Sequence, residues 1–334
     1  PVTGCTKVSA GCKNCYAEGV ANRFFASQYR PVLASDPTKT IDTVSTSHHE
    51  DMLAMGLARP RKFTDVMTHN DRLTQPLSWK KPCKVFVNSM SDLFHADVPF
   101  EFIDRVFAVM ALTPHITYQI LTKRPERMRE YWAADRWNIV EQAIEIVSDE
   151  KGDVAGRLLR EQFEDDPSKY PLPNVWPGVS VENQETADKR IPELLNTPAA
   201  KRFVSYEPAL GPVDFGRWIG GDDGDNHCVR CGCVWLEDGI SEHDPCPSGF
   251  GPRLDWIIVG GESGPGARPF DIEWALSTVR QCKVAGVPVF VKQVGSRPFC
   301  SGRHGEWKPK DRKGGDPSEW AEDLRVREFP AVSR

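Results

Sequence analysis

Short apolar segments alternate along the chain with longer amphipathic ones. The short segments are rich in β-branched and aromatic residues and end in polar residues, which is typical of buried parallel strands. They are residues 84–88, 117–122, 175–180, 202–205, 255–260 and 287–292. The longer segments carry apolar residues at helical spacing and are residues 100–112, 137–148, 185–195 and 272–285. Strands that alternate with helices predict a parallel α/β sheet.

The number of segments predicts how this sheet is organised. If residues 1–4 end a further strand, the chain has about seven strands, which suits a full or partial TIM-type (β/α) barrel. An open doubly wound sheet is the alternative, although the Gly-rich segment 260–266 lacks the spacing of a dinucleotide-binding loop. We expect a first barrel part at 1–220, a small inserted metal-binding module at 221–250, a last barrel part at 251–300, and a tail at 301–334 that either covers the barrel mouth or is a flexible surface segment.

The composition is that of a globular protein. Of its 334 residues, 40% are hydrophobic and 27% are charged, and 16 Phe and 10 Trp provide material for a core. An apolar run long enough for a membrane span is absent from the sequence, as is a basic segment followed by an apolar one, so we expect no membrane contact and a cytoplasmic location. In that compartment, the ten cysteines are expected to bind metals or to stay as thiols.

The charge limits the partners of the protein. A formal net charge of −5 argues against a surface covered by Lys and Arg for bulk nucleic-acid binding, but it is compatible with a local basic groove. Two groups of basic residues could line such a groove or belong to a solvated surface: Arg23, Arg30, Arg59, Arg61 and Lys62, and Arg297, Arg303, Lys308, Lys310, Arg312 and Lys313.

Three cysteines lie close to the start of the chain. Cys5, Cys12 and Cys15 have the spacing C-x6-C-x2-C, and Tyr16 directly follows the third. Iron–sulfur clusters are normally held by four Cys thiolates, so a cluster with three leaves one iron open to a substrate or cofactor. A zinc knuckle, or a disulfide pair with a spare thiol, is the alternative.

Polar residues follow each predicted strand. In a barrel, the carboxyl ends of the strands face one mouth, where active sites lie. Capping and turn chemistry accounts for many such residues, but a charged group is costly to bury unless it is paired or used. The charged residues at the strand ends are therefore candidate catalytic residues, with ion pairs across the mouth as the alternative: Lys123, Glu182, Glu207 and Lys292.

The cysteine loop and the strand ends together resemble the radical SAM-like three-cysteine-motif family of phage and bacterial proteins, where SAM is S-adenosylmethionine. The resemblance rests on residues 1–18, 87–94, 121–127, 178–183, 205–208, 260–264 and 314–320. It implies a 4Fe-4S cluster on Cys5, Cys12 and Cys15, with SAM bound through its amino and carboxylate groups at the fourth iron. It further implies a radical SAM enzyme, an electron donor as partner, and further chain before Pro1 in the first strand.

Other residues are assigned by their place along such a barrel. The loop of Asn88, Ser89 and Asp92 would contact the methionine amino group of SAM, and Ser180, Glu182 or Ser205 would contact the ribose hydroxyls. Glu262, at the end of a later strand, is a further cofactor-binding candidate. A nucleoside, a nucleic-acid base or a modified base is the expected substrate, because the aromatic and Arg-bearing loops could stack on a nucleotide and neutralise it.

A second group of cysteines lies in the predicted insertion. Cys228-x2-Cys231 and His243-x2-Cys246 have the spacing of the two halves of a zinc site, with Cys233 as an alternative ligand. Such a site would stabilise a loop that has little core of its own. An auxiliary iron–sulfur cluster on the four cysteines of this segment is the alternative.

Two other functions remain open on the sequence alone. One is a zinc-dependent nucleic-acid or protein-binding module without catalysis. The other is an iron–sulfur redox sensor. The remaining cysteines, Cys83, Cys282 and Cys300, are expected to be inert buried thiols.

Overall fold

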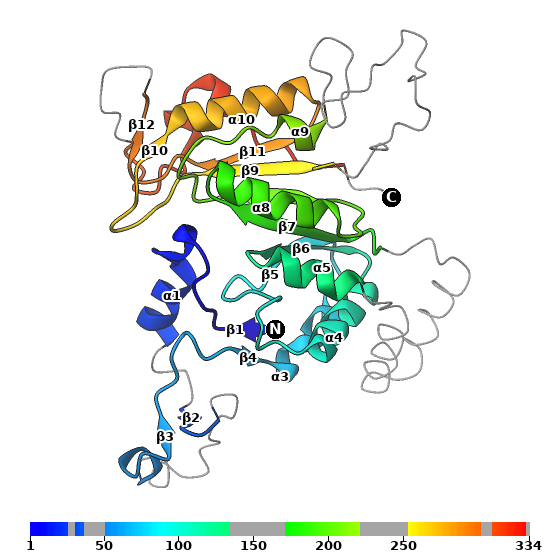
Figure 1. The fold of residues 1–334 in the computed structure, drawn as a ribbon, viewed down its shortest axis with the longest axis vertical. Coiled ribbons are helices and arrows are strands. Elements are labelled where there is room, and N and C mark those ends of the chain that lie inside the picture. The colour runs from blue at the N-terminus through cyan, green and yellow to red at the C-terminus, as the bar shows by residue number, and fades with distance from the viewer. Residues whose placement is uncertain (26–30, 37–50, 134–170, 221–252, 302–308, 332–334) are drawn as a thin grey trace, which may run out of the picture. The chain divides into compact units, whose positions relative to one another are not determined.

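A computed structural model describes residues 1–25, 31–36, 51–133, 171–220, 253–301 and 309–331, which are coloured in Figure 1. The chain divides into two compact units: unit 1 is Pro1–Ile120 with Ala134–Pro167, and unit 2 is Leu121–Ala133 with Ser168–Arg334. The predicted helix at 137–148 and the predicted metal-binding module at 221–250 lie outside the described residues.

All six strands predicted from the apolar segments form, and they join one sheet in the order β11-β9-β8-β7-β6-β5. They are β5 (Cys83–Val87), β6 (Ile116–Thr122), β7 (Val175–Val181), β8 (Phe203–Tyr206), β9 (Trp256–Gly260) and β11 (Val289–Gln293). The pairs β5–β6, β7–β8, β8–β9 and β9–β11 are parallel. The strand order follows the chain without the reversal of a doubly wound sheet, so the parallel α/β prediction is confirmed, and the order favours a singly wound barrel.

The strands of unit 2 enclose an aromatic core. Every residue of β7 is buried, and Trp176, Phe203 and Trp256 form a cluster against which Phe290 packs. A Cβ on Gly178 would lie 2.5 Å from the Phe203 ring. The absence of a side chain at Gly178 in β7 therefore leaves room for the ring of Phe203 in β8. The apolar segment that forms β7 is therefore buried on both faces of the sheet, as expected for a parallel strand.

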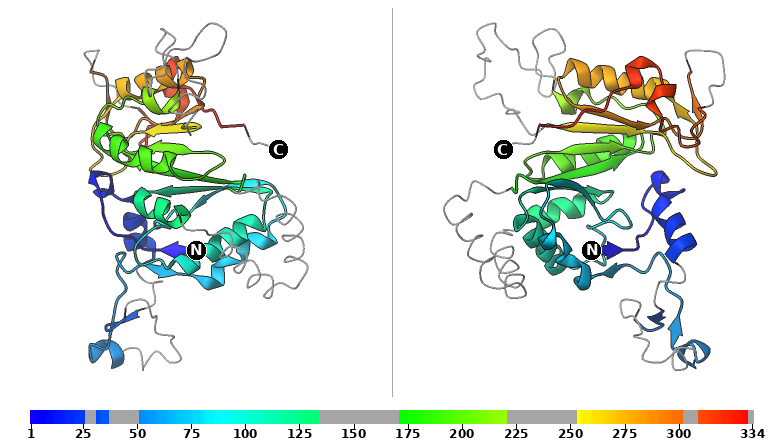
Figure 2. Two further views of the ribbon diagram at one scale, coloured as in Figure 1. Left: turned by 45° about the vertical axis from the view of Figure 1, so that its right-hand side comes forward. Right: turned by 180° about the vertical axis from the view of Figure 1, so that it is seen from behind.

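Helices follow the strands. The amphipathic pattern predicted α4 (Phe100–Ala111), α8 (Gln184–Leu195) and α10 (Ile272–Val284), and α5 (Pro125–Ala133) is a further helix that it did not predict. In unit 2, α8 packs against β7, and α10 packs against β9 and β11 (Figure 2). Asn183 and Thr186 form a capping box at the start of α8, and the Asp271 carboxylate accepts the Glu273 N–H at the start of α10. These caps fix where two of the helices begin.

The described part of the C-terminal tail lies along the outer edge of β11. The Val291 N–H donates to the Val326 carbonyl at 2.9 Å, and the Glu328 N–H donates to the Val289 carbonyl at 3.0 Å. The Arg327 guanidinium lies over the Phe290 ring at 5.4 Å. The tail thus covers a strand edge that would otherwise expose unpaired backbone groups.

The remaining elements are short. In unit 1 they are β1 (Val2–Thr3), η1 (Ala10–Cys12), α1 (Tyr16–Val20), η2 (Ala21–Phe25), β2 (Val32–Leu33), β3 (Ala58–Arg59), β4 (Met67–Thr68), α3 (Asn70–Leu73) and η3 (Gln75–Ser78). In unit 2 they are α9 (Gly216–Ile219), β10 (Phe270–Asp271), β12 (Pro298–Phe299), η5 (Pro317–Glu319) and η6 (Glu322–Leu324). Among the described helices, none is both long and apolar enough to cross a membrane.

The first residues differ from the prediction. Val2 and Thr3 pair in antiparallel fashion with β4 in a separate two-stranded sheet, whereas a place in the main sheet was expected. Gly4 then forms a parallel bridge with Ser91. Directly after β1, the chain therefore lies beside the loop that follows β5.

Candidate functional site

The loop that carries Cys5, Cys12 and Cys15, which we call the cysteine loop, belongs to unit 1 and is fixed at its start. Gly4 has φ +93°, and a Cβ at this position would lie 2.6 Å from the Asp65 carbonyl oxygen. The Gly4 N–H donates to the Met90 carbonyl at 3.2 Å, and the Cys5 N–H donates to the Phe63 carbonyl at 3.0 Å. Only glycine accepts this conformation and this close approach without strain, so Gly4 sets where the cysteine loop begins.

The segment 88–95, after β5, holds the cysteine loop at two further points, one through a side chain and one through a backbone carbonyl. Thr6 Oγ1 and His95 Nε2 are 2.8 Å apart. His95 Nδ1 accepts the Asp97 N–H, so Nε2 of a neutral imidazole carries the proton and donates to Thr6. The Tyr16 hydroxyl donates to the Ser89 carbonyl at 2.9 Å. The tertiary structure thus brings together the cysteines and the Asn88–Asp92 loop, two segments that the sequence separates.

The three cysteines are not in disulfides, and their side chains are neither buried nor fully exposed. Cys5 and Cys15 pack beside Met90 against a small cluster of Ala17, Ala21 and Phe63. Within the described part of the chain, His, Cys, Asp and Glu side chains do not gather in any group of three or more that could hold a metal ion. Three thiols are chemically suitable ligands of an iron–sulfur cluster. In this structure, however, they do not surround a common point.

The predicted SAM contacts at Asn88, Ser89 and Asp92 differ from the arrangement found. Asn88 Oδ1 accepts the Val2 N–H at 3.2 Å, while its buried Nδ2 has no hydrogen-bond partner among the described residues. An amide N–H is a donor, so it suits a carboxylate and not the methionine ammonium that the sequence suggested. The Ser89 carbonyl accepts from Tyr16, and the Asp92 carboxylate accepts the Phe94 N–H at 3.0 Å.

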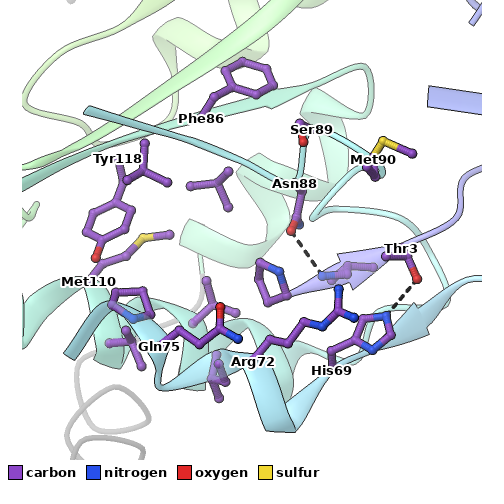
Figure 3. A pocket seen from close by; sticks show the side chains of 18 of the residues that line it. Thr3, His69, Arg72, Gln75, Phe86, Asn88, Ser89, Met90, Met110 and Tyr118 are labelled. Atoms are coloured by element: carbon purple, nitrogen blue, oxygen red, sulfur yellow. Dashed lines mark hydrogen bonds between the residues drawn. The ribbon is translucent and has the colours of Figure 1, made fainter. Parts of the chain in front are cut away.

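Asn88 borders a cavity of about 280 Å³ in unit 1 (Figure 3). Apolar side chains form most of its wall, and Thr3, His69, Arg72 and Gln75 add polar groups. His69 shares a hydrogen bond of 2.8 Å with Thr3. Burial, aided by nearby Arg72 and Arg61, lowers the pKa of His69 to about 4, so its imidazole is neutral at physiological pH. Sequence reasoning missed His69, because no motif surrounds it.

In unit 2, the predicted catalytic residue Glu182 is held in a buried ion pair. Its carboxylate is 1% exposed, and it accepts from Arg190 at 3.0 Å and lies 3.5 Å from Lys123 Nζ. Lys123 also donates to the Ser180 hydroxyl. A carboxylate neutralised from two sides is suited to structural pairing, which was the alternative for these charges. Arg190 was not predicted, because it lies on α8 two turns after the strand end.

Glu207, at the end of β8, is more open. Its Oε2 accepts from Ser205 at 3.2 Å and from Lys292 at 3.1 Å, and its backbone carbonyl accepts from Ser180 at 3.1 Å. The Lys292 side chain is 56% exposed and the Glu207 side chain 17%. A Cβ on Gly260 would overlap Glu207 Oε1, so this glycine leaves room for the carboxylate. Glu207 and Lys292 thus present an acceptor and a donor side by side.

The Glu262 carboxylate binds Arg268 through both oxygens. Oε1 accepts from Arg268 Nη2 at 2.7 Å, and Oε2 accepts from the Arg268 backbone N–H and Nε, both at 2.9 Å. This hydrogen bonding, with a further contribution from the charge of Glu182, raises the pKa of the Arg268 guanidinium. The charged groups that follow β7 and β9 therefore interact with one another electrostatically. Glu262 was predicted to bind the cofactor, yet both of its oxygens are already engaged.

The structure groups the predicted residues by unit. Unit 1 holds Cys5, Cys12, Cys15, Asn88, Ser89 and Asp92, and unit 2 holds Lys123, Ser180, Glu182, Ser205, Glu207, Glu262 and Lys292. The predicted zinc ligands Cys228, Cys231, Cys233, His243 and Cys246 lie outside the described residues.

The three scattered cysteines differ from one another. Cys282 is buried, and burial raises the pKa of its thiol to about 12, as expected for an inert core cysteine. Cys300 is half-buried, and Cys83 is exposed because the first residues of β5 face solvent. The prediction that Cys83 is buried was wrong.

A family model described as "Protein of unknown function (DUF5131)" matches residues 1–313. The chain belongs to the DUF5131 family. The match includes the cysteine loop of unit 1 and the strand ends of unit 2. Neither a curated protein nor a solved structure matches the chain. Membership of DUF5131 names no activity, so the radical SAM resemblance stays a prediction.

Proposed function

We propose that this DUF5131 protein is a radical SAM enzyme that binds a 4Fe-4S cluster through Cys5, Cys12 and Cys15. The observation that carries the proposal is the state of the three thiols. None of the three is in a disulfide, all three are partly exposed, and they lie on one loop that is fixed at its start by Gly4 and Cys5 and continues into α1 after Cys15. Three thiolates on such a loop provide three ligands and leave one iron open.

The loop has the freedom that metal binding requires. Between its fixed ends, residues 6–8, 10, 13 and 14 are exposed. Binding a metal draws its ligands together and couples to local folding. We expect the exposed middle of the loop to move so that Cys12 approaches Cys5 and Cys15, while the contacts of Gly4 and Tyr16 hold the ends.

The residues around the loop would orient the bound groups. When bound and reduced, a three-cysteine cluster supplies the electron that cleaves SAM and begins radical chemistry. The buried Asn88 Nδ2 offers a hydrogen-bond donor that a carboxylate of SAM could accept. His95 positions Thr6, next to Cys5, and so holds the loop against the segment after β5.

Unit 2 carries candidate acid–base groups of its own. Ser180 and Ser205 are buried; Ser180 donates to the Glu207 backbone carbonyl and Ser205 to the Glu207 carboxylate, so we assign them to holding Glu207 and not to the ribose of SAM. Glu207 and Lys292 are the better acid–base candidates, because each retains an exposed part. An electron donor is the protein partner that this chemistry requires, and zinc at Cys228, Cys231, His243 and Cys246 remains part of the proposal.

The test is anaerobic reconstitution with iron and sulfide, followed by reduction in the presence of SAM. We expect about four irons per chain at the N-terminal site, visible absorbance, and release of 5′-deoxyadenosine and methionine. Cys12→Ala should lose the absorbance and the cleavage. Cys83→Ala is the matched control, because Cys83 is also a free thiol of unit 1 but lies outside the loop.

Two results would overturn the proposal. One is SAM cleavage that persists in Cys12→Ala. The other is a colourless protein that binds zinc at the cysteine loop and does not cleave SAM, which would support the binding module instead. If Cys228→Ala also lowers the iron content, the second group of cysteines holds an auxiliary cluster and not zinc.

A further inference from the structure

Three loops of unit 2 meet beyond the ends of β9 and β11. They are residues 262–268, 294–297 and 310–316, which we call the basic loop cluster. Ser296 joins all three: its N–H donates to the Glu262 carbonyl at 2.9 Å, and its hydroxyl accepts the Gly264 N–H at 3.0 Å and donates to the Arg312 carbonyl at 2.6 Å. The Val294 N–H donates to the Gly314 carbonyl at 2.9 Å. Segments separated along the sequence therefore form one connected surface.

The carboxylates of this surface are used within it. Glu262 binds Arg268, Asp311 accepts the Gly315 N–H, and Asp316 accepts the Ser318 N–H at 2.9 Å. These acids therefore stabilise turns and a single ion pair. Asp311 and Asp316 bond to backbone N–H groups and leave nearby cations without a carboxylate partner.

Four cations of the cluster are exposed. One is Lys310, at the start of the third loop, and the three considered below are Arg297, Arg312 and Lys313. Among the residues that the structure describes, none of the three is paired with a carboxylate, and the guanidinium of Arg297 touches only the Ala267 carbonyl, at 3.5 Å. Added Cβ atoms at Gly264 and Gly266 would meet nothing within 4 Å, so the first loop leaves open space beside them. The surface thus presents cations on fixed loops with room for a polymer to approach.

We propose that the basic loop cluster binds the phosphate backbone of a nucleic acid through Arg297, Arg312 and Lys313. Arg and Lys side chains on fixed backbone are the groups that position a protein on such a backbone. A local concentration of cations can do this even though the whole chain carries a net charge of −5. The binding of a nucleic acid does not depend on the proposed function. The inference rests on that function only for the further step in which the bound strand is the substrate of the radical chemistry.

A nucleic acid fits the cluster better than an anionic membrane does. Surfaces that insert into a membrane combine cations with large exposed apolar side chains. The large apolar side chains that are exposed in the described residues lie outside these three loops. Phe299, 38% exposed, follows Arg297 by two residues and offers a ring on which an unpaired base could stack.

Fluorescence anisotropy with a labelled single-stranded oligonucleotide of about 20 nucleotides, with no SAM present, measures this binding. The test variant is Arg297→Gln, Arg312→Gln and Lys313→Gln combined. The matched control is Lys80→Gln, Lys81→Gln and Lys84→Gln, which removes the same charge from exposed positions of unit 1. Thermal unfolding of both variants checks that each is folded.

We expect the test variant to bind at least about tenfold more weakly at low salt than the wild type or the control. The dependence of its log affinity on log salt should be shallower by about 2, because three phosphate contacts are lost. Equal losses in the test and control variants would overturn the inference, as would an unchanged affinity of the test variant. Binding to vesicles that contain phosphatidylserine, without binding to the oligonucleotide, would overturn it in favour of a membrane surface.

The outcome is separable from that of the proposed function. Iron content and SAM cleavage without nucleic acid are expected to be unchanged in the test variant. If oligonucleotide binding depends on the cluster but SAM is not cleaved, only the radical SAM proposal fails. If SAM is cleaved but the three substitutions leave binding intact, only the docking inference fails.

Discussion

The cysteine loop of unit 1 and the strand ends of unit 2 hold their reactive groups in opposite ways. The cysteine loop is fixed at its ends and exposed in its middle, and its cysteine side chains are partly exposed. At the strand ends, Glu182 and Glu262 are buried, and each is bound by at least one cation. A buried carboxylate is tolerated only where cations neutralise it, whereas partly exposed thiols have no comparable requirement.

The largest effect on stability should come from the strand ends. Glu182→Gln removes the charge that neutralises Arg190, which is itself almost fully buried, and should lower the free energy of unfolding by about 3–5 kcal/mol. Urea unfolding measures this loss. Glu193→Gln on the same helix is the control, because its partner Arg129 is half exposed and such a pair contributes about 0–1 kcal/mol. Similar losses in both variants would show that the burial of Glu182 carries no special cost.

Gly4→Ala should produce the next largest effect, in unit 1. Its φ of +93° and the nearby Asp65 carbonyl oppose a Cβ, so we expect a loss of about 2 kcal/mol, measured by thermal unfolding. Iron binding should weaken as well, because the start of the cysteine loop shifts. Gly19→Ala serves as the control, since Gly19 lies within α1 and has open space around it. Normal iron binding in Gly4→Ala would show that the start of the loop need not be fixed.

His69 makes the stability of unit 1 depend on pH. Its pKa in the folded protein is about 4, below the ordinary 6.5, so between these values the unfolded chain binds the proton more readily. The stabilisation by neutral His69 is complete above pH 6.5 and is lost as the pH falls through 4. We expect a loss of about 2 kcal/mol over this range. Urea unfolding of His69→Gln should show a smaller slope there; an identical slope would assign the dependence to other groups.

The smallest effect on stability is expected from the cysteines. Cys12→Ala should change the free energy of unfolding of the metal-free protein by less than about 0.5 kcal/mol, because the thiol is partly exposed and packs against little. Differential scanning calorimetry of the metal-free protein measures this. A large loss would mean that Cys12 has a structural role, and it would remove the contrast between the two regions.

Much of the fold could be predicted from the sequence, for local reasons. The apolar segments at 117–122 and 175–180 are short, β-branched and bounded by polar residues, and they form β6 and β7. The caps of α8 and α10 are also local, since Asn183 and Asp271 bond to N–H groups within three residues. Residues 1–4 were harder to place, because the partner of β1 is β4, more than sixty residues away, and the pattern of two residues does not specify a pairing.

The candidate site was predictable only in part. Residue type and position after a strand indicated Glu207 and Lys292, which the structure brings together. The same reasoning gave Glu182 and Glu262, but it did not reveal Arg190 or Arg268 as their partners, since these lie in a helix and a loop with their own local patterns. Whether a charged residue is paired or available depends on neighbours that the sequence does not place.

The sequence by itself determined the parallel α/β class, most strand and helix positions, and the three thiols that lie within eleven residues of one another. Each of these depends on residues that are neighbours along the chain. Only the tertiary structure decided that the cysteine loop rests on the segment after β5, that Glu182 is neutralised, and that Ser296 joins three loops into one basic surface. These features depend on contacts between distant segments, which form only when the apolar segments pack together and fix where the polar ends of the strands lie.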